Sequence, residues 1–316
     1  MTAPPLPAEF ALIARHFRPL AGPAGLGLTD DAALLDPPPG RALVLTVDTM
    51  VAGVHFLPDD PPDLVARKLL RVNLSDLAAK GATPLGYLLA LSVPRATPEA
   101  WFAAFAAGLA QDQAAFAIPL LGGDTTSTPG PVSLSLTALG HVAAGGMVRR
   151  AGARAGDLVF VTGCIGEAAL GLRVARGERA DPTGRLLARY RLPTPRLGLV
   201  TPALVRAAMD VSDGLVQDLG HLCRAAGLGA EIEAALVPRP AEAGPDELAL
   251  CLTGGDDYEL LLAVAPEAQT ALETAAREMH IPLARIGRFQ AGVETVILRD
   301  PAGAPIALGA GGWSHF

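Results

Sequence analysis

The 316-residue chain lacks the features that mark secreted and membrane proteins. Its three cysteines, Cys164, Cys223 and Cys251, are odd in number and widely spaced, with no C-x-x-C motif. This pattern predicts unpaired core thiols in a reducing compartment. No apolar run approaches the roughly 20 residues that a membrane helix needs, and the N-terminus shows no basic segment followed by an apolar stretch. We therefore expect a soluble, cytoplasmic protein with no membrane partner.

The chain is also short of positive charge and of standard catalytic motifs. It contains 25 Lys and Arg residues and 32 Asp and Glu residues, which give a net charge of -7, and it has no basic run. This composition argues against a nucleic-acid partner. There is no G-x-x-x-x-G-K-[ST] phosphate loop, no V-A-I-K or H-R-D kinase motif, and no evident Ser-His-Asp or Cys-His set. An acidic protein that handles phosphates therefore needs metal ions to bridge the two negative partners.

What the chain does contain is an alternation of helical and strand-like patterns. Half of the residues are hydrophobic, and the length suits two domains or one large one. Apolar spacing predicts helices at 7–17, 62–80, 98–115, 166–176 and 266–280. Strands are expected at 42–47, 85–93, 131–138, 158–162, 229–237, 248–252, 260–265, 283–289 and 294–299. The pattern indicates an α/β (α+β) chain with a domain boundary in the loop-rich stretch near residue 145.

Acidic residues recur in turns and at the ends of the predicted elements. The set comprises Asp31, Asp48, Asp76, Asp124, Asp210 and Asp213. Carboxylates gathered from several loops bind hard divalent cations, which usually bring phosphates. Because no His or Cys accompanies them, the set favours Mg²⁺ over zinc. The residues alone therefore indicate metal-bridged phosphate chemistry.

Two of the acidic stretches are expected to be turns. Residues 210–214, Asp-Val-Ser-Asp-Gly, are expected to connect two helices, and Ser212 or Asp213 could simply cap the second helix. Residues 122–126, Gly-Gly-Asp-Thr-Thr, contain two glycines whose backbone N–H groups can approach an anion. The recurrence of such turns favours a functional role over capping alone.

Other positions leave two interpretations open. Asp76 shares an otherwise apolar helix face with Asn73, where a carboxylate is costly unless it is paired or metal-bound. The pair at residues 30–31 can be a solvated turn, and His55 can be structural. The arginines at 149–150 can be solvated or can contact phosphate. The strand at 131–138 alternates apolar with hydroxyl residues, so its polar face could be a sheet–sheet or subunit interface.

Taken together, six motifs resemble those of the thiamine-monophosphate kinase family. In chain order they are Asp30-Asp31-Ala-Ala-Leu-Leu, Asp48-Thr49 with Gly53-Val-His55-Phe56, Val72-Asn73-Leu-Ser-Asp76-Leu-Ala-Ala-Lys-Gly-Ala, Gly122-Gly-Asp124-Thr-Thr, Asp210-Val-Ser-Asp-Gly-Leu and Gly254-Gly-Asp-Asp-Tyr-Glu-Leu. Each motif is weak alone, but six in this order are specific and span nearly the whole chain. The family belongs to a superfamily with aminoimidazole ribonucleotide synthetase, selenophosphate synthetase and the hydrogenase maturation factor HypE.

The resemblance implies a two-domain fold like that of aminoimidazole ribonucleotide synthetase. Residues 1–145 would form the N-terminal metal-binding, ATP-binding and dimerisation domain, whose sheet pairs with that of a second copy in a homodimer barrel. Residues 146–316 would form a C-terminal α/β domain. The implied reaction is ATP + thiamine monophosphate → ADP + thiamine diphosphate, by direct in-line transfer with several Mg²⁺ ions. The acceptor is a phosphate oxygen that is already anionic, so no strong general base is needed.

The resemblance also implies a role for individual residues. The implied Mg²⁺ ligands are Asp31, Thr46, Asp48, Asp76, Asp124, Asp210 and Asp213, of which Asp210 and Asp213 form the implied catalytic pair. The implied nucleotide contacts are Gly123, Asp124, Arg150 and Ser212. The implied thiamine-phosphate contacts are His55, Asp256 and Trp313.

Two departures and two alternatives accompany the resemblance. Thr29 stands where the family usually has Gly, and Val47 stands where it usually has a hydroxyl residue, so the local coordination could differ. A sister synthetase is one alternative, although selenophosphate synthesis would want a reactive Cys near the N-terminus, and the first here is Cys164. A non-catalytic nucleotide-binding or carrier protein is the other. A carrier like HypE would present a C-terminal Cys, and this chain ends in Trp-Ser-His-Phe; a degenerate nucleotide-binding scaffold should have lost part of the acidic set, and the set is complete.

Overall fold

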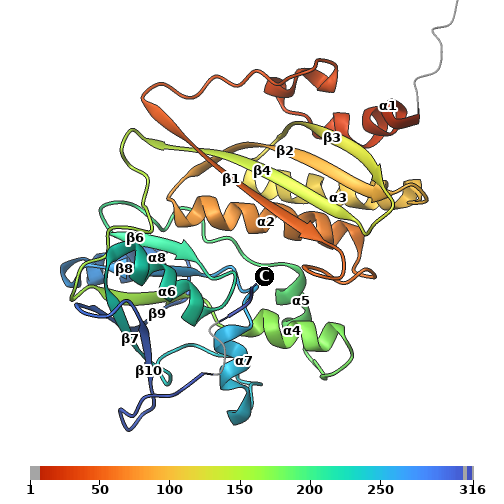
Figure 1. The fold of residues 1–316 in the computed structure, drawn as a ribbon. Coiled ribbons are helices and arrows are strands. Elements are labelled where there is room, and N and C mark those ends of the chain that lie inside the picture. Colours follow the sequence, from red (N-terminus) through yellow and green to blue (C-terminus); the bar gives the residue numbers. More distant parts are fainter. Residues whose placement is uncertain (1–7, 309–311, 315–316) are drawn as a thin grey trace, which may run out of the picture. The chain divides into compact units, whose positions relative to one another are not determined.

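The computed structural model describes residues 8–308 and 312–314. The chain forms two compact units (Figure 1). The N-terminal unit holds the described residues up to Leu77 together with Thr83–His141. The C-terminal unit holds Ala78–Ala82 and the described residues from Val142 onward. Each unit contains one sheet of its own.

The N-terminal unit is a mixed four-stranded sheet with helices on one face. Its strands are β1 (Arg41–Val51), β2 (Thr83–Pro94), β3 (Leu120–Thr128) and β4 (Ser133–Ala143), in the order β1-β4-β2-β3. Strand β2 runs parallel to β3 and antiparallel to β4. The helices α2 (Pro62–Ala79) and α3 (Glu99–Phe116) lie along the same face of this sheet (Figure 1). The predicted strands and helices of this half are therefore confirmed, apart from the turn at 122–126.

The two faces of this sheet have different environments. On β4, Leu134, Leu136 and Ala138 are fully buried, while the hydroxyl residues between them are only partly buried. On β1, Leu43, Leu45 and Val47 are 39%, 61% and 61% exposed, although all three are apolar. Because successive strand residues point to opposite faces, these apolar side chains lie on one face and Thr46 and Asp48 on the other. The sheet thus leaves an apolar stripe uncovered within its own unit.

The C-terminal unit is a six-stranded sheet with helices on both faces. Its strands are β5 (Leu158–Thr162), β6 (Ala207–Asp210), β7 (Gly229–Glu233), β8 (Leu260–Val264), β9 (Leu283–Gln290) and β10 (Val296–Arg299), in the order β10-β7-β9-β5-β8-β6. One core packs α6 (Leu215–Ala226) against the sheet, and a separate core packs α8 (Gln269–Glu278) against it. Every residue of β5 and β8 is buried, which explains their continuous apolar sequences.

The remaining helices are short. They are α1 (Ala8–Leu12), α4 (Glu167–Ala175), α5 (Arg185–Arg191) and α7 (Leu248–Thr253). The helix expected at 7–17 is present as α1, which continues as a π-helical turn over Ile13–Phe17; Pro7 lies outside the described residues. All three cysteines are unpaired, as predicted, and Cys223 and Cys251 are buried.

Three expectations about local structure are wrong. Residues 207–210 form strand β6 instead of a helix, because they pair with β8 and are buried on both sides of the sheet. Residues 248–252 belong to helix α7 instead of a strand. Residues 122–126 lie inside β3 instead of a turn, because they pair in parallel with residues 88–92 of β2. A Cβ on Gly123 would lie 1.9 Å from the carbonyl oxygen of Leu89. The glycine there allows two strands to approach closely.

Candidate functional site

The N-terminal unit gathers an acidic cluster where β1 lies against α2. The Thr46 hydroxyl donates a hydrogen bond to the Asp76 carboxylate. The backbone N–H of Asp48 donates to the side-chain oxygen of Asn73 at 3.1 Å, and the Asn73 amide donates to the carbonyl of Leu69 at 2.9 Å. The structure therefore brings together three of the predicted ligands, Thr46, Asp48 and Asp76, and adds Asn73 as the residue that fixes the strand against the helix.

Electrostatics in this cluster favour the arrival of a cation. Burial, and then the nearby negative charge of Asp76, raise the pKa of Asp48 to about 7. Both effects disfavour the ionised carboxylate, and a positive ion beside the two groups would reverse the second of them. An oxygen-only set of this kind matches the ligands that Mg²⁺ prefers.

The two departures from the family pattern leave these carboxylates untouched. Val47 is 61% exposed and lies on the face of β1 opposite to Asp48, so its side chain is not part of the cluster. Thr29 has φ -116°, a conformation that any residue adopts, and its hydroxyl donates to the carbonyl of Leu26 at 2.9 Å. A glycine is therefore not required at residue 29.

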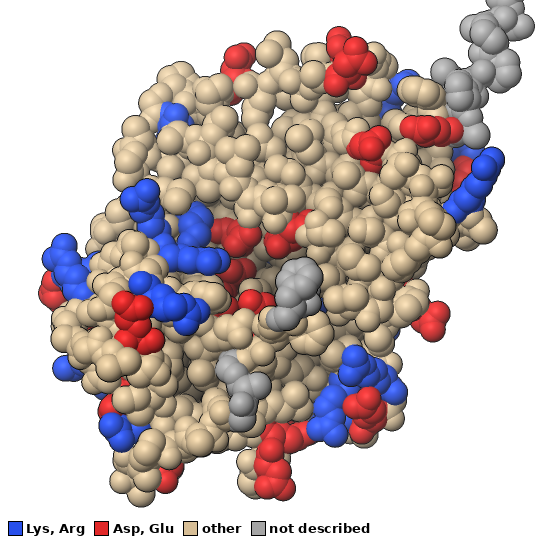
Figure 2. Space-filling model, viewed as in Figure 1, with Lys and Arg blue, Asp and Glu red and all other residues tan. Residues whose placement is uncertain are grey.

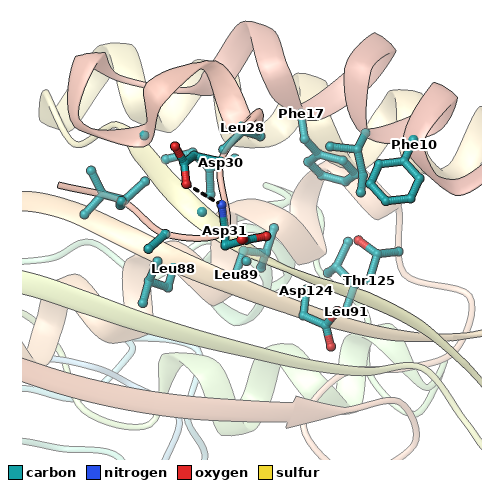
Figure 3. A pocket seen from close by; sticks show the side chains of 18 of the residues that line it. Phe10, Phe17, Leu28, Asp30, Asp31, Leu88, Leu89, Leu91, Asp124 and Thr125 are labelled. Carbon is teal, nitrogen blue, oxygen red and sulfur yellow. Dashed lines mark hydrogen bonds between the residues drawn. The ribbon is translucent and has the colours of Figure 1, made fainter. Parts of the chain in front are cut away.

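A pocket of about 290 Å³ lies elsewhere in the same unit, between the N-terminal segment and strands β2 and β3. Its lining includes Asp31 and residues 122–125 of β3. The rings of Phe10 and Phe17 lie side by side at one end, away from Asp30 (Figure 3). The backbone N–H of Asp31 donates to the Asp30 carboxylate at 2.8 Å, which shapes the turn. The predicted residues Asp31, Gly123 and Asp124 thus line one cavity.

His55 has a structural contact in the loop after β1. Its ring nitrogen Nδ1 accepts a hydrogen bond from the backbone N–H of Val51 at 3.0 Å, and its carbonyl accepts one from the buried Lys68 ammonium at 3.3 Å. These bonds fix the loop and the orientation of the ring. The structural interpretation of His55 is therefore supported, and its substrate role remains a prediction.

In the C-terminal unit, Asp210 ends strand β6 and the turn at 211–214 follows. Asp210 is 5% exposed, whereas Asp213 is only partly buried. Helix α6 begins at Leu215 with Gly214 at its N-cap, and no side chain of the described residues caps it. The alternative in which Ser212 or Asp213 caps the helix is therefore wrong, and the Asp213 carboxylate is available for other chemistry.

The turn is held by Asp218, a residue that sequence reasoning did not select. One oxygen of its carboxylate accepts hydrogen bonds from the backbone N–H groups of Ser212, Asp213 and Gly214 at 3.0, 3.1 and 3.1 Å. Asp218 is 1% exposed, and its other oxygen has no partner among the described residues. Burial, and then the charge of Asp213, raise the Asp218 pKa to about 7. The available signal was the third carboxylate within the stretch 210–218.

Asp213 and Asp218 also lie near His221, one turn further along α6. One ligand atom from each of the three residues lies within 4.8 Å of the others. Partial burial lowers the pKa of His221, and the guanidinium groups of Arg224 and Arg150 lower it further. Arg150, a predicted nucleotide contact, is exposed. Because its charge lowers the pKa of His221, it acts on the same region as the turn.

A second loop, residues 254–259, packs directly on this turn. The backbone N–H of Asp256 donates to the carbonyl of Ser212 at 2.7 Å, and that of Tyr258 donates to the carbonyl of Val211 at 2.8 Å. Gly255 has φ +69°, and a Cβ there would lie 2.3 Å from the Ser212 carbonyl oxygen. Asp256 itself has φ +65°, a costly conformation for a residue with a side chain. The predicted substrate residue Asp256 is thus held in place beside the turn.

The other acids of this loop have structural roles. Asp257 is buried and accepts hydrogen bonds from the backbone N–H groups of Gly166 and Ala168, at the start of α4. Glu259 is fully buried and pairs with Arg189 and Arg196 at 2.7 Å. Ion pairs of this kind are frequent in the unit, and Figure 2 shows acidic and basic side chains interspersed on its drawn face. Asp256 therefore remains the functional candidate in its motif.

Trp313 lies against the same turn. Its backbone N–H donates to the carbonyl of Asp213 at 2.9 Å, and its side chain is half exposed. The structure thus brings together the predicted residues Asp213, Ser212, Asp256 and Trp313; the final aromatic, Phe316, lies outside the described residues. Within the described part of the chain, no helix is both long and apolar enough to cross a membrane.

Two family models together match most of the chain. The model of the AIR synthase related protein, N-terminal domain, matches residues 29–142, and that of the AIR synthase related protein, C-terminal domain, matches residues 154–299. The thiamine-monophosphate kinase of Caulobacter vibrioides is 45% identical over 300 residues, which cover 90% of this chain and 85% of the relative.

Solved structures agree with these matches. The crystal structure of a thiamine-monophosphate kinase from Stenotrophomonas maltophilia K279a superposes with a TM-score of 0.82 at 42% identity, covering 92% of this chain and 96% of that one. The structure of AaThiL complexed with AMPPCP and TMP superposes with a TM-score of 0.77 at 29% identity, covering 98% and 97%. The expected fold, with two domains of mixed α/β content, is confirmed.

Proposed function

The chain belongs to the thiamine-monophosphate kinase family, and we propose that it transfers the terminal phosphoryl group of ATP to thiamine monophosphate, giving thiamine diphosphate. The observation that carries this proposal is the group of oxygen ligands Thr46, Asp48 and Asp76, in a fold that, in AaThiL, is complexed with AMPPCP and TMP. AMPPCP is a non-transferable analogue of ATP, so that complex pairs a nucleotide with a phosphate acceptor.

We propose Mg²⁺ as the metal of the reaction. The residues fit it, since they offer only oxygen atoms. The pKa of Asp48 is raised first by burial and then by the negative charge of Asp76, and a bound cation would offset that charge. The residues that would hold it are Asp31, Thr46, Asp48, Asp76, Asp124, Asp210 and Asp213. When bound, Mg²⁺ neutralises the crowded phosphates and orients the transferred group.

We assign the nucleotide to the N-terminal half, residues 1–145, and in particular to the pocket beside β3. Phe10 and Phe17 offer an apolar wall for a base, and Gly123 lines the same pocket. Asp124, at the same pocket, would meet the nucleotide through its metal. In the C-terminal half, residues 146–316, Arg150 and Ser212 are the proposed further contacts, because a guanidinium and a hydroxyl both bind phosphate oxygens.

Catalysis in this proposal depends on positioning and needs no general base. The acceptor is an anionic phosphate oxygen, so the chain must align it with the donor and offset repulsion. Asp210 and Asp213 would serve the transferred phosphate, with Asp213 kept in place by Asp218. His55, Asp256 and Trp313 are the proposed thiamine-phosphate contacts. The half-exposed Trp313 ring can stack on a thiazolium ring, with cation–π attraction of about 0.5–2 kcal/mol.

We further propose a cytoplasmic homodimer in which the N-terminal sheets of two copies pair. The support is the apolar stripe of Leu43, Leu45 and Val47 on the sheet face that lies away from α2 and α3. An exposed apolar stripe of this kind typically marks an interface. Leu45→Asp should therefore shift the protein to monomers in sedimentation velocity, and a dimer that survives this change would contradict the assignment of the face.

The function is tested by ADP release with ATP, Mg²⁺ and thiamine monophosphate, run beside thiamine and an aminoimidazole ribonucleotide precursor. We expect ADP formation only with thiamine monophosphate, together with thiamine diphosphate as product. ADP formation with another acceptor instead would move the chain to a sister activity. Absence of turnover with every acceptor would contradict the kinase assignment.

A further inference from the structure

Gln217, on the first turn of α6, contacts both the catalytic turn and the C-terminal segment, residues 312–314. Its side-chain amide donates to the carbonyl of Trp313 at 2.6 Å and to the carboxylate of Asp213 at 3.2 Å. The two N–H bonds of one amide group therefore join a residue proposed for the transferred phosphate to a residue proposed for the acceptor. No motif of the sequence singled out Gln217.

The main chain of the segment makes close contact with the same two residues. The backbone N–H of Trp313 donates to the Asp213 carbonyl at 2.9 Å. A Cβ on Gly312 would lie 2.6 Å from that carbonyl oxygen and 2.7 Å from the Cβ of Gln217, so glycine is needed for this approach. The Trp313 side chain is 50% exposed, so burial of the ring contributes only part of what holds the segment, and the hydrogen bonds matter accordingly.

We propose that Gln217 is a positioning residue that makes docking of Trp313 and orientation of the Asp213 carboxylate depend on each other. When the segment is docked, one amide hydrogen bonds the Trp313 carbonyl and the other bonds the carboxylate. The bond to the carboxylate is charge-assisted, so it restricts rotation of Asp213 toward the orientation seen in the structure. An acceptor that engages the Trp313 ring would thereby favour the same orientation of Asp213. This inference rests on the proposed function.

The test uses the full-length protein in a Trp101→Phe background, where Trp313 is the single remaining tryptophan. Gln217→Glu keeps the length and shape of the side chain but replaces the donor with a carboxylate, which repels Asp213 and the Trp313 carbonyl. Gln217→Ala removes the donor without adding charge. Gly312→Ala releases the segment by steric contact alone. Gln269→Glu, on helix α8, makes the same chemical change elsewhere and serves as the matched control.

Two readouts are measured, quenching of Trp313 fluorescence by acrylamide and the steady-state constants for each substrate. In Gln217→Glu we expect stronger quenching and a KM for thiamine monophosphate raised about tenfold, which corresponds to the loss of one or two hydrogen bonds. Gln217→Ala and Gly312→Ala should change both readouts in the same direction but less. The KM for ATP should stay at its wild-type value in all of them, which a general loss of structure would not allow.

Wild-type quenching in Gln217→Glu would overturn the proposal, because the segment would then dock without the amide. Stronger quenching with an unchanged KM for thiamine monophosphate would also overturn it, because docking would then be unrelated to the acceptor. If the wild-type protein phosphorylates no thiamine monophosphate, the proposed function fails instead. In that case the quenching measurements alone still decide whether Gln217 holds the segment.

Discussion

In the N-terminal unit, Thr46, Asp48 and Asp76 project from a strand and a helix, whereas in the C-terminal unit Asp213 projects from a turn. The side chains of Thr46 and Asp48 point toward α2 because alternate residues of β1 face that helix. The turn takes its shape from one carboxylate, Asp218, that accepts three backbone N–H bonds.

This difference determines which substitutions should reduce activity in each unit. In a helix or strand, the backbone does not move when a functional side chain is shortened, so only the contacts of that side chain should be lost. In the turn, a residue that never meets a substrate can displace one that does. The variants below separate these two cases, and they are ordered by expected effect.

Asp213→Asn should have the largest effect, because it removes a charge from the turn while leaving its shape intact. We expect kcat to fall about a thousandfold, the scale of losing a main electrostatic contact to the transferred group. The thermal unfolding transition should stay where it is. Asp246→Asn, on an exposed short helix, is the control with the same chemical change. Turnover near wild type in Asp213→Asn would refute the assigned role.

Asp218→Ala should follow, because three backbone N–H groups lose their acceptor. We expect about a hundredfold loss of kcat, and about 1–3 kcal/mol of lost stability from unsatisfied donors. Asp218→Asn keeps one acceptor oxygen and should retain more activity than the alanine variant. Steady-state kinetics and urea unfolding of both variants measure the difference. Equal activity of the two would mean that hydrogen bonding to the turn is not the function of Asp218.

Thr46→Val tests the acidic cluster that lies on regular elements, β1 and α2. It removes the hydroxyl that bonds Asp76 but keeps the shape and strand preference of the residue. The Mg²⁺ concentration needed for half-maximal activity should rise about tenfold, as for other residues that support a metal ligand. Stability should change little. Thr49→Val, which alters a hydroxyl on the opposite face of the same strand, is the control; an equal rise there would contradict the assignment.

Asp257→Asn should have the smallest effect, a change in how steeply the free energy of unfolding varies with pH. Burial raises the pKa of Asp257 from 3.8 to about 7, so between these values the folded chain binds more protons than the unfolded chain. The contribution of this group to the free energy of unfolding therefore declines as pH rises through that range. Asp257→Asn cannot titrate, and its stability curve from urea unfolding should be flatter from about pH 4 to pH 7. Parallel curves would contradict the shift.

Predictions from the sequence were best where the signal was local. Alternation and apolar runs identified β1, β5 and β8, and helical spacing identified α2 and α3. Strand β6 was missed because residues 207–210 are buried on both sides, and a uniformly buried strand shows no period that separates it from a helix. The stretch 122–126 was misread as a turn because glycines can serve either a turn or a close approach of two strands.

The sequence by itself determined the family and the α/β class of this protein, and it selected the carboxylates that we propose for the site. These depend on residue types and spacings within short stretches, which are visible without a structure. Only the tertiary structure decided that Asp218 holds the turn, that Gly255 lies against Ser212, and that Gln217 joins Asp213 to Trp313. The last two contacts join residues about 40 and about 100 positions apart, and the first uses a carboxylate that the sequence offers equally for solvent, metal or backbone. Which partner each group finds is set by how the whole chain packs.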